Sequence, residues 1–288
     1  MRRVGGNEGR GRAKVTDVVI QAGGMGQRLL PYTTVLPKPL MPVAGRPILE
    51  IVIRQLARCG LGNITVTLGH LGELIEAVVA RRDAWGASVA FVTEDEPLGT
   101  IGAVTLVSDI SAPFIVMNGD ILTDLDYAAF LADHVAGGAD LSIATYAKDV
   151  SISLGVFDFD RHGRVNGFYE KPTYRFPCSM GIYAFSPELL EIVPRGAHFG
   201  FDDLIQRCLA DEINVRVHQH EGLWLDIGRH EDYEHATKLF TQNRHLLLPD
   251  ATDESVPAAA TPVPSQRRSA RPRSGRRLTP ALAEPAGA

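Results

Sequence analysis

Short apolar runs rich in β-branched residues alternate with longer amphipathic stretches along most of the chain. The apolar runs predict β-strands over Asp17–Ile20, Ile64–Leu68, Val89–Thr93, Phe114–Met117, Asp140–Tyr146, Asn214–His218 and Leu223–Ile227. The amphipathic stretches predict helices over Pro47–Cys59, Leu71–Arg82, Thr100–Val107, Leu125–Val135, Phe201–Ala210 and Glu231–Leu247. Strands that alternate with helices predict an α/β fold with a mostly parallel sheet covered on both faces.

The composition and the predicted elements of the sequence change at three places. Residues 1–14 are rich in Gly and Arg and predict a flexible N-terminal segment. From about Ser151 to Phe185, short β segments and turns dominate, so we expect residues 15–247 to divide into a part over 15–150 and a smaller β-rich part over 151–247. Residues 248–288 are rich in Pro, Ala and Arg and lack aromatic residues, which predicts a disordered tail.

Composition narrows the class of protein. The 288 residues carry a formal net charge of −5, which does not indicate nucleic acid as the main partner. No apolar run approaches the roughly 18 residues that span a bilayer, and the N-terminus does not resemble a secretory signal. Cys59, Cys178 and Cys208 are scattered without metal-ligand spacing, so we expect free thiols in a reducing cytoplasm.

A glycine-rich loop follows the first predicted strand and indicates a phosphate site. Gly23, Gly24 and Gly26, after Gln21 and Ala22, let the backbone bring its N–H groups close to a ligand. Arg28 adds a permanent charge, and Lys38 stands between two prolines on stiff backbone. Leu29 replaces the third glycine of a dinucleotide fingerprint, and no Gly-Lys-Ser/Thr forms a P-loop. The combination suggests a nucleoside triphosphate site, and a plain tight turn is the alternative.

Two acids end apolar segments and are candidate metal ligands. Asp120 follows the strand Phe114–Met117, where open α/β sheets bind ligands, and Asp226 ends another apolar segment before a helix. Carboxylates are natural Mg²⁺ ligands in phosphate chemistry, although Asp120 could start a turn and Asp226 could cap the helix. The pair Asp124 and Asp126 has the Asp-x-Asp spacing of many nucleotide-sugar glycosyltransferases, but here it opens a helix, where acids cap and suit the macrodipole.

These motifs together resemble the sugar-1-phosphate nucleotidylyltransferases. The family signature Gly-Gly-x-Gly-x-Arg-Leu, Pro and Pro-Lys-Pro stands here as residues 23–29, Pro31 and residues 37–39, with Gln27 where Thr or Ser is more usual. The resemblance covers roughly residues 16–233 and implies a Rossmann-like fold of the nucleotide-diphospho-sugar transferase type. It implies transfer of a nucleotide from a nucleoside triphosphate to a sugar 1-phosphate with release of pyrophosphate. Arg28 and Lys38 would be catalytic, and Asp120 and Asp226 would hold the metal, Mg²⁺.

The resemblance also assigns residues to the sugar phosphate. They are Asn118, directly after the strand Phe114–Met117, and Gly155, Glu170, Lys171 and Ser179 of the β-rich part, with Lys171 on the phosphate. Because neighbouring residues of a strand point to opposite faces, we expect no simple salt bridge between Glu170 and Lys171. Ser179 replaces the more usual asparagine, so the identity of the sugar does not follow from the family.

The segment from Glu94 to Thr100, which includes Gly99, indicates the nucleobase. A carboxylate accepts hydrogen bonds from the two adjacent donors of guanine, and the segment resembles the guanylyltransferase branch. GTP with mannose 1-phosphate or a heptose 1-phosphate is therefore the expected substrate pair. The alternatives are a thymidylyl- or uridylyltransferase acting on glucose 1-phosphate, and a non-catalytic sugar-nucleotide sensor. The sequence does not fix the oligomeric state and is compatible with a homo-oligomer.

Overall fold

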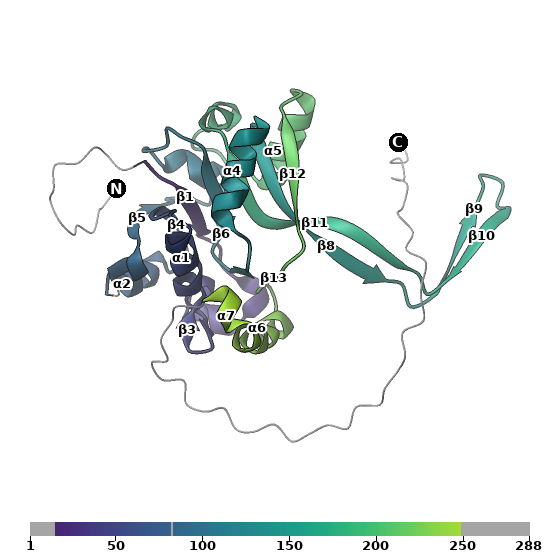
Figure 1. Ribbon diagram of the computed structural model, residues 1–288, viewed down its shortest axis with the longest axis horizontal. Helices are drawn as coiled ribbons and strands as arrows, with labels where there is room; N and C mark the ends of the chain where they lie inside the picture. The colour runs from purple at the N-terminus through teal and green to yellow at the C-terminus, as the bar shows by residue number, and fades with distance from the viewer. Residues whose placement is uncertain (1–14, 82, 249–288) are drawn as a thin grey trace, which may run out of the picture.

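The computed structural model describes residues 15–81 and 83–248, which form a central seven-stranded sheet with helices on both faces (Figure 1). The strands follow the order β12-β8-β11-β6-β1-β4-β5, and only β11 runs antiparallel to its neighbours. Their bounds are β1 (Val18–Ala22), β4 (Asn63–Leu68), β5 (Ser88–Thr93), β6 (Phe114–Asn118), β8 (Leu141–Ser151), β11 (Thr173–Phe185) and β12 (Val215–His220). The predicted mixed, mostly parallel α/β fold is confirmed.

Three two-stranded pairs lie outside the main sheet. They are β2 (Pro42–Val43) with β3 (Arg46–Pro47), β7 (Ile121–Thr123) with β13 (Trp224–Asp226), and β9 (Gly155–Phe159) with β10 (Val165–Glu170). The α-helices are α1 (Ile48–Arg58), α2 (Gly72–Ala80), α3 (Gly99–Gly102), α4 (Tyr127–Gly137), α5 (Phe201–Ala210), α6 (His230–Gln242) and α7 (Arg244–Leu247). Among the described residues, no helix is long and apolar enough to cross a membrane.

Apolar side chains fill the space on both faces of the sheet. Successive residues of β1 alternate between two core clusters, with Val18 and Ile20 in the larger one and Val19 in the smaller one. The larger cluster includes most of α1, whose isoleucine, leucine and valine side chains are fully buried. The smaller cluster includes Leu204 and Cys208 of α5. A sheet buried on both faces requires the continuous apolar strands from which it was predicted.

The helix and strand predictions differ from the structure mainly in length. The helix predicted over Thr100–Val107 is α3 followed by a 3₁₀ turn, η5 (Ala103–Leu106), and the one predicted over Glu231–Leu247 is divided into α6 and α7 at Asn243. The segment expected to hold only short β pieces contains β11, which runs for 13 residues. The N-terminal segment, all of the predicted tail but Leu248, and Arg82 lie outside the described residues, and the division near residue 150 stays a prediction.

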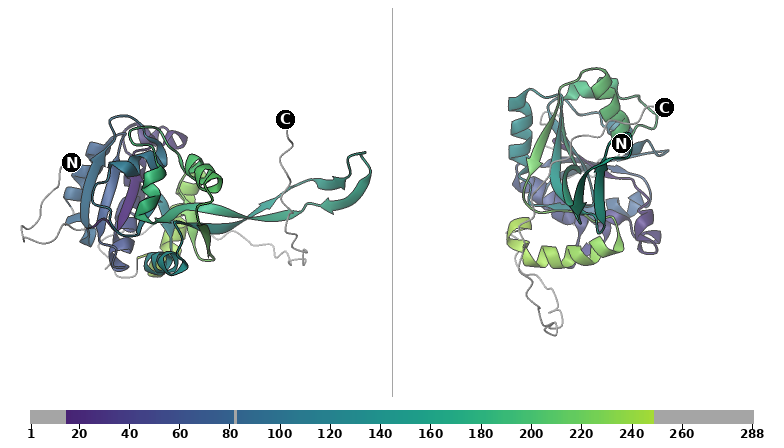
Figure 2. Two further views of the ribbon diagram at one scale, coloured as in Figure 1. Left: turned by 90° about the horizontal axis from the view of Figure 1, so that it is seen from above. Right: turned by 90° about the vertical axis from the view of Figure 1, so that its right-hand side faces the viewer.

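The outer parts of β8 and β11, with β9 and β10, form an arm that projects from the sheet (Figure 2). Strand β8 pairs with both β11 and β12 up to Tyr146, and beyond that residue it pairs with β11 alone. The arm comprises residues 147–178. It carries three of the residues assigned to the sugar-phosphate side, Gly155, Glu170 and Lys171.

Candidate active site

The glycine loop lies at the carboxyl end of β1 and is fixed at one glycine. Gly26 has a φ of 60°, and a Cβ atom there would lie 2.7 Å from Cγ2 of Thr33, so only glycine fits. The Thr33 hydroxyl donates to the Gly26 carbonyl at 3.0 Å. Gly24 and Met25 at the apex of the loop remain exposed. The loop is therefore fixed at its end, and its apex is open to a ligand.

The loop forms one wall of a cavity of about 960 Å³ at the carboxyl ends of β1, β4, β5 and β6. This volume is at the upper end of the range for small-molecule sites. Twelve of the residues proposed from the sequence line it: Gln21, Ala22, Gly23, Gly24, Gly26, Arg28, Lys38, Glu94, Gly99, Thr100, Asn118 and Asp120. The cavity thus forms at the carboxyl ends of the parallel strands, where the sequence predicts the ligand site.

Lys38 lies between the two predicted metal ligands. It begins the 3₁₀ turn η3 (Lys38–Leu40), and its ammonium group pairs with Oδ2 of Asp120 and lies 3.7 Å from Oδ1 of Asp226. The Lys38 side chain is only 11% exposed, so this contact is shielded from water. Oδ1 of Asp120 is buried and has no hydrogen-bond partner among the described residues. A buried acceptor of this kind is available to a cation that enters with a ligand.

The environment of Asp226 raises the pKa of its carboxyl group. Burial is the main cause and the nearby Asp120 charge adds to it, while Lys38 and Arg28 act in the opposite direction. Two carboxylates that share one site disfavour ionisation of both, and a positive charge relieves this repulsion. The site therefore favours an additional cation beside these acids. In the described part of the chain no cluster of three or more His, Cys, Asp or Glu could hold a metal alone, so phosphate oxygens or water would complete the ligand set.

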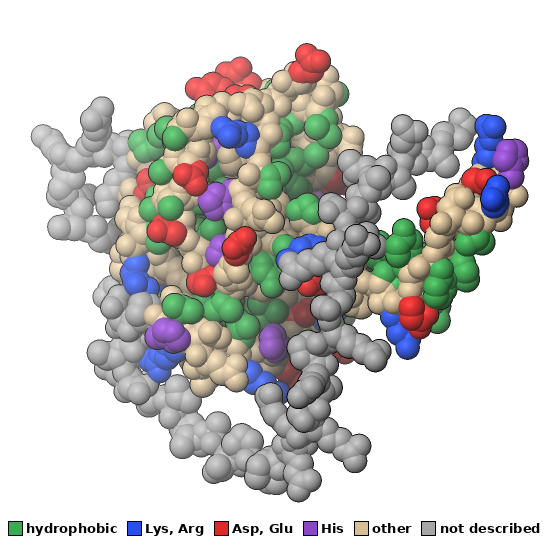
Figure 3. Space-filling model, turned by 45° about the vertical axis from the view of Figure 1, so that its right-hand side comes forward, with side chains coloured by type: hydrophobic (Ala, Val, Ile, Leu, Met, Phe, Trp, Pro, Cys, Tyr) green, Lys and Arg blue, Asp and Glu red, His purple; other side chains and the backbone are tan. Residues whose placement is uncertain are grey.

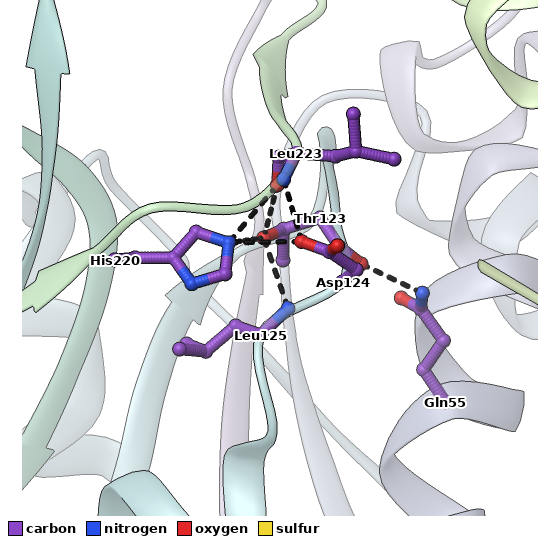
Figure 4. Close-up of polar contacts among 6 residues, drawn as sticks. All are labelled: Gln55, Thr123, Asp124, Leu125, His220 and Leu223. Atoms are coloured by element: carbon purple, nitrogen blue, oxygen red, sulfur yellow. Dashed lines mark hydrogen bonds and ion pairs between the residues drawn. The ribbon is translucent and has the colours of Figure 1, made fainter. Parts of the chain in front are cut away.

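A cluster of polar contacts joins the end of β7 to the start of β13 (Figure 4). Strand β13 pairs with β7, and this register places Asp226 opposite Ile121, next to Asp120 in sequence. Behind this pair, Oδ1 of Asp124 accepts a hydrogen bond from the Leu223 N–H at 2.6 Å and lies 2.9 Å from Nε2 of His220. We use the term latch for Asp124, His220 and Leu223. It fixes the entry of β13 and, with it, the position of Asp226.

The Asp-x-Asp pair therefore has two different roles. Asp126 is the N-cap of α4 and accepts from the Ala129 N–H at 3.0 Å, which confirms the expected capping role. Asp124 caps no helix and belongs to the latch instead. Asp226 does not cap α6, whose N-cap is Arg229 without a side-chain bond. The capping alternative for Asp226 is thus wrong.

Glu94 has a fixed position on the wall of the cavity. Its Oε2 accepts from the Leu98 N–H at 2.8 Å, and a Cβ atom on Gly23 would lie 2.5 Å from its Oε1. Gly99 has a φ of 74° and packs against the Phe199 carbonyl. The carboxylate therefore reaches into the cavity between the glycine loop and the segment 94–100. One of its oxygens is held by the backbone.

The residues assigned to the sugar-phosphate side are not gathered in one place. Asn118 lines the cavity, close to Gly181, whose φ of 72° lets the Asn118 amide approach. Ser179 lies on β11, where its hydroxyl donates to the Tyr183 hydroxyl at 3.2 Å. Gly155, Glu170 and Lys171 lie on the arm and do not line the cavity.

The expectation that Glu170 and Lys171 form no ion pair is wrong. Their side chains lie 3.8 Å apart, Nζ to Oε1. Strand β10 ends at Glu170, and Lys171 has a φ of 48°, so the alternation of a strand no longer applies at this step. Both side chains are well exposed, at 68% for Lys171 and 62% for Glu170. The pair is therefore available to a ligand.

Sequence reasoning missed part of the cavity wall formed after β4. Gly69 and His70 line the cavity, and a Cβ atom on Gly69 would lie 2.6 Å from the Gly23 carbonyl oxygen. The His70 N–H donates to the same carbonyl at 3.3 Å. A Gly-His pair directly after a predicted parallel strand was the signal that could have found them, because neighbouring parallel strands end at the same edge.

Comparison with known proteins agrees with this geometry. The family model described as nucleotidyl transferase matches residues 17–243. The chain is 28% identical over 240 residues to a UTP–glucose-1-phosphate uridylyltransferase of Synechocystis, covering 76% of this chain and 62% of the relative. It is 29% identical to a mannose-1-phosphate guanyltransferase of Schizosaccharomyces pombe, covering 81% and 66%. The chain thus spans less than two thirds of the length of these relatives.

Solved structures share the fold. HddC from Yersinia pseudotuberculosis, solved in complex with GMP-PN, superposes with a TM-score of 0.61 at 28% identity, covering 78% of this chain and all of that one. A putative glucose-1-phosphate thymidylyltransferase from Bacillus anthracis gives a TM-score of 0.60 at 21% identity, covering 77% and 94%, and supports the fold alone. With a family model that matches most of its length and a cavity lined by the signature residues, the chain belongs to the nucleotidyl transferase family.

Proposed function

We propose that the protein transfers a guanylyl group from GTP to mannose 1-phosphate or a heptose 1-phosphate and releases pyrophosphate. The observation that carries this proposal is the placement of Lys38 between Asp120 and Asp226 in a cavity whose wall is the glycine loop. Such a site binds a triphosphate along the loop and neutralises charge at the reacting phosphorus. Similarity to the mannose-1-phosphate guanyltransferase of Schizosaccharomyces pombe and to HddC, which was solved with GMP-PN, favours the guanylyl branch.

The transfer is a single in-line displacement. A phosphate oxygen of the sugar 1-phosphate attacks the α-phosphorus of the nucleotide, and the bond from this phosphorus to the oxygen bridging to the β-phosphate breaks. The electron pair of that bond leaves with pyrophosphate. Arg28 from the glycine loop and Lys38 stabilise the charge that develops on the phosphate oxygens. No covalent enzyme intermediate is needed, because orientation and electrostatics account for such transfers.

Asp120 and Asp226 would hold Mg²⁺. The buried Oδ1 of Asp120 without a partner and the raised pKa of the Asp226 carboxyl fit a cation at this position. When bound, Mg²⁺ supplies Lewis-acid neutralisation of the phosphate charge. Lys38 shares both carboxylates and keeps them oriented. The donor set of two carboxylates with phosphate oxygens is typical of magnesium sites.

Glu94 would select the base. With its Oε2 held by the Leu98 N–H, its Oε1 faces the wall near Gly23 and can accept from the donors on the pairing edge of guanine. Replacement Glu94→Gln introduces a donor in place of an acceptor and should reduce turnover of GTP by roughly tenfold or more, the value of one good base contact. Turnover of UTP should fall less.

The Synechocystis relative, whose name gives UTP and glucose 1-phosphate, supports a uridylyl alternative at nearly the same identity. A grid of nucleoside triphosphates against several sugar 1-phosphates in Mg²⁺, read by the mass of the nucleotide-sugar, separates the two. Product from GTP with a mannose or heptose phosphate supports the proposal. Product from UTP or dTTP alone would contradict the role of Glu94, and ligand binding without any product would favour a sensor.

The compartment is also a proposal. Cys59, Cys178 and Cys208 are free thiols in the structure. Free thiols that persist are typical of a reducing environment, so we place the enzyme in the cytoplasm, where nucleoside triphosphates are available.

A further inference from the structure

The arm extends far beyond the edge of the central sheet. Beyond Tyr146, β8 continues for five residues paired only with β11, and β9 adds five more. At about 3.3 Å per residue, these two segments span roughly 30 Å away from the sheet. Figure 2 shows the arm extending outward as a narrow ribbon, and no other helix or strand of the described residues lies over it.

The arm is braced in this extended form. The Arg175 guanidinium makes two hydrogen bonds to the Asp149 carboxylate, at 2.6 and 2.8 Å. At the joint between the two parts of the arm, the Ile152 N–H donates to the Pro172 carbonyl at 3.0 Å. Bidentate pairs of this kind fix geometry as well as adding energy. These contacts therefore hold the strands of the arm together along its length.

One face of the arm tip is apolar and exposed. The register of β9 and β10 pairs Phe157 with Phe168, whose rings lie 4.9 Å apart, and Phe159 with Val165. Phe157 is 56% exposed, Phe168 is 53% exposed and Phe159 is 65% exposed. The next pair on this face is Gly155 with Glu170. Figure 3 shows hydrophobic side chains gathered along the arm, with basic and histidine side chains at its end.

A two-stranded hairpin is marginally stable in water without cover, and an apolar face of this size often marks an interaction site. With about 200 Å² per phenylalanine, the three rings and the half-exposed Phe176 present roughly 400 Å² on each arm. If two arms are covered and each covers an equal area, the contact totals roughly 1,600 Å², the size of a standard stable interface. A reciprocal contact between two copies of this chain would therefore bury enough surface for a stable dimer.

A second group of exposed apolar side chains, which we call the mouth patch, begins at the glycine loop. It comprises residues of the glycine loop and the turns that follow it: Met25, Leu30, Tyr32 and Val35. Met25 itself lines the cavity. The cavity, in turn, receives no residue from the arm, although the arm carries the exposed Lys171 and Glu170. The arm and the mouth patch both expose apolar side chains. The apolar face of the arm lies beside Glu170 and Lys171, and the mouth patch includes Met25 of the cavity wall.

We propose that two copies of the chain form a two-fold dimer in which the arm of each copy packs on the mouth patch of the other. In this arrangement Glu170 and Lys171 of one copy face the cavity that contains Lys38 and Asp120 of the other copy. Lys171 then binds the sugar phosphate for the neighbouring cavity, a role that rests on the proposed function. Reciprocal contacts of this kind close on themselves and leave no unpaired patch, as isologous dimers require.

The first test measures the oligomeric state by sedimentation velocity, which does not depend on activity. The wild-type chain should be a dimer, and Phe157→Glu together with Phe168→Glu should give a folded monomer, checked by circular dichroism. Val217→Glu is the matched control, because Val217 is a large apolar residue, 62% exposed, that lies on the edge strand β12 outside the arm. A monomeric wild type, or a dimer that only Val217→Glu disrupts, would overturn the proposal.

The second test identifies whose arm reaches which cavity. A carbodiimide joins amines to nearby carboxylates, so it should link Lys171 to the exposed Asp95 or Glu96 at the cavity wall. In a dimer reassembled from ¹⁵N-labelled and unlabelled chains, links between copies appear as mixed-isotope peptide pairs. Mixed pairs support arm exchange. Pairs of one isotope only would mean that the arm serves its own cavity.

The third test is complementation between inactive variants. Asp120→Asn disables the cavity and Lys171→Ala disables the arm, so a mixed dimer retains one complete site. Random reassembly should recover about a quarter of wild-type activity, since about half of the dimers are mixed and each has one working site of two. A mixture of Asp120→Asn with Lys38→Ala is the control and should recover nothing. Dimers without recovery would overturn arm exchange, whereas a wild type inactive in the substrate grid would instead contradict the proposed function.

Discussion

The latch provides the sharpest mutational test of how the site is positioned. Replacement Asp124→Ala removes the acceptor shared by the Leu223 N–H at 2.6 Å and His220 Nε2 at 2.9 Å. Hydrogen bonds to a charged acceptor contribute about 1.5–3 kcal/mol each, and an orphaned buried donor costs a similar amount. His220 also lies 3.3 Å from the Leu223 carbonyl, which offers its ring another partner. We therefore expect a net loss of about 2 kcal/mol.

Urea denaturation followed by tryptophan fluorescence measures this loss. With a typical denaturant slope, about 2 kcal/mol lowers the midpoint by roughly 1 M without changing the slope. Activity should fall as well, because the latch fixes the start of β13, the strand that carries Asp226. A displacement of about 1 Å at a reacting group costs up to roughly 100-fold in rate, so we expect kcat to fall by about tenfold to 100-fold.

Two neighbouring variants serve as controls. Asp126→Ala removes only the cap of α4, so it should cost about 1 kcal/mol of stability and leave kcat unchanged. Asp124→Asn keeps an acceptor for the Leu223 N–H and should retain most of both properties. An Asp124→Ala protein with wild-type stability and activity would refute the positioning role. Loss of activity in Asp126→Ala would instead favour a metal-binding Asp-x-Asp pair.

Three further predictions follow from single contacts. Gly23→Ala places a Cβ atom 2.5 Å from Oε1 of Glu94. The KM for the nucleotide should therefore rise in steady-state assays while the fold is kept. An unchanged KM would contradict the placement of Glu94. Gly181→Ala puts a side chain on a residue with a φ of 72° and places its Cβ atom 2.7 Å from the Asn118 amide. The free energy of unfolding, measured in urea, should therefore fall by about 1–2 kcal/mol or more. An unchanged free energy would contradict this strain. Folding raises the pKa of Asp226, so without metal the folded state binds its proton more tightly than the unfolded chain. Stability in EDTA should therefore fall slightly as pH rises from the ordinary aspartate pKa through the raised value, and Asp226→Asn should abolish this slope.

The strands and helices around the cavity could be predicted from the sequence because their cause is local. A strand buried on both faces, such as β1, must be apolar throughout, and the helix α1 shows its period directly. The cavity followed from the same pattern, because the parallel strands end at one edge. Most of the residues proposed on the nucleotide side, including Arg28, Lys38 and Asp120, do line it.

The arm and the latch could not be predicted because their causes are distant in sequence. Asp124 meets Leu223 across 99 residues, and no local pattern encodes that contact. The residues of β11 alternate weakly, since its outer half is exposed on both faces, and so a strand of 13 residues was expected to be short pieces. Lys171 departs from strand geometry because its φ is positive, and a lysine in the sequence gives no indication of a positive φ. The sequence therefore predicts which residues bind the sugar phosphate, but not where the arm holds them.

Release of pyrophosphate tests the central claim that this cavity is the triphosphate half of a nucleotidyl transfer site. Wild-type protein with GTP, Mg²⁺ and mannose 1-phosphate or a heptose 1-phosphate should release pyrophosphate in step with nucleotide-sugar formation. Asp120→Asn removes the charge that pairs with Lys38 and the expected metal ligand, so release should fall by roughly 10³-fold or more. Near-normal release by Asp120→Asn would contradict the account.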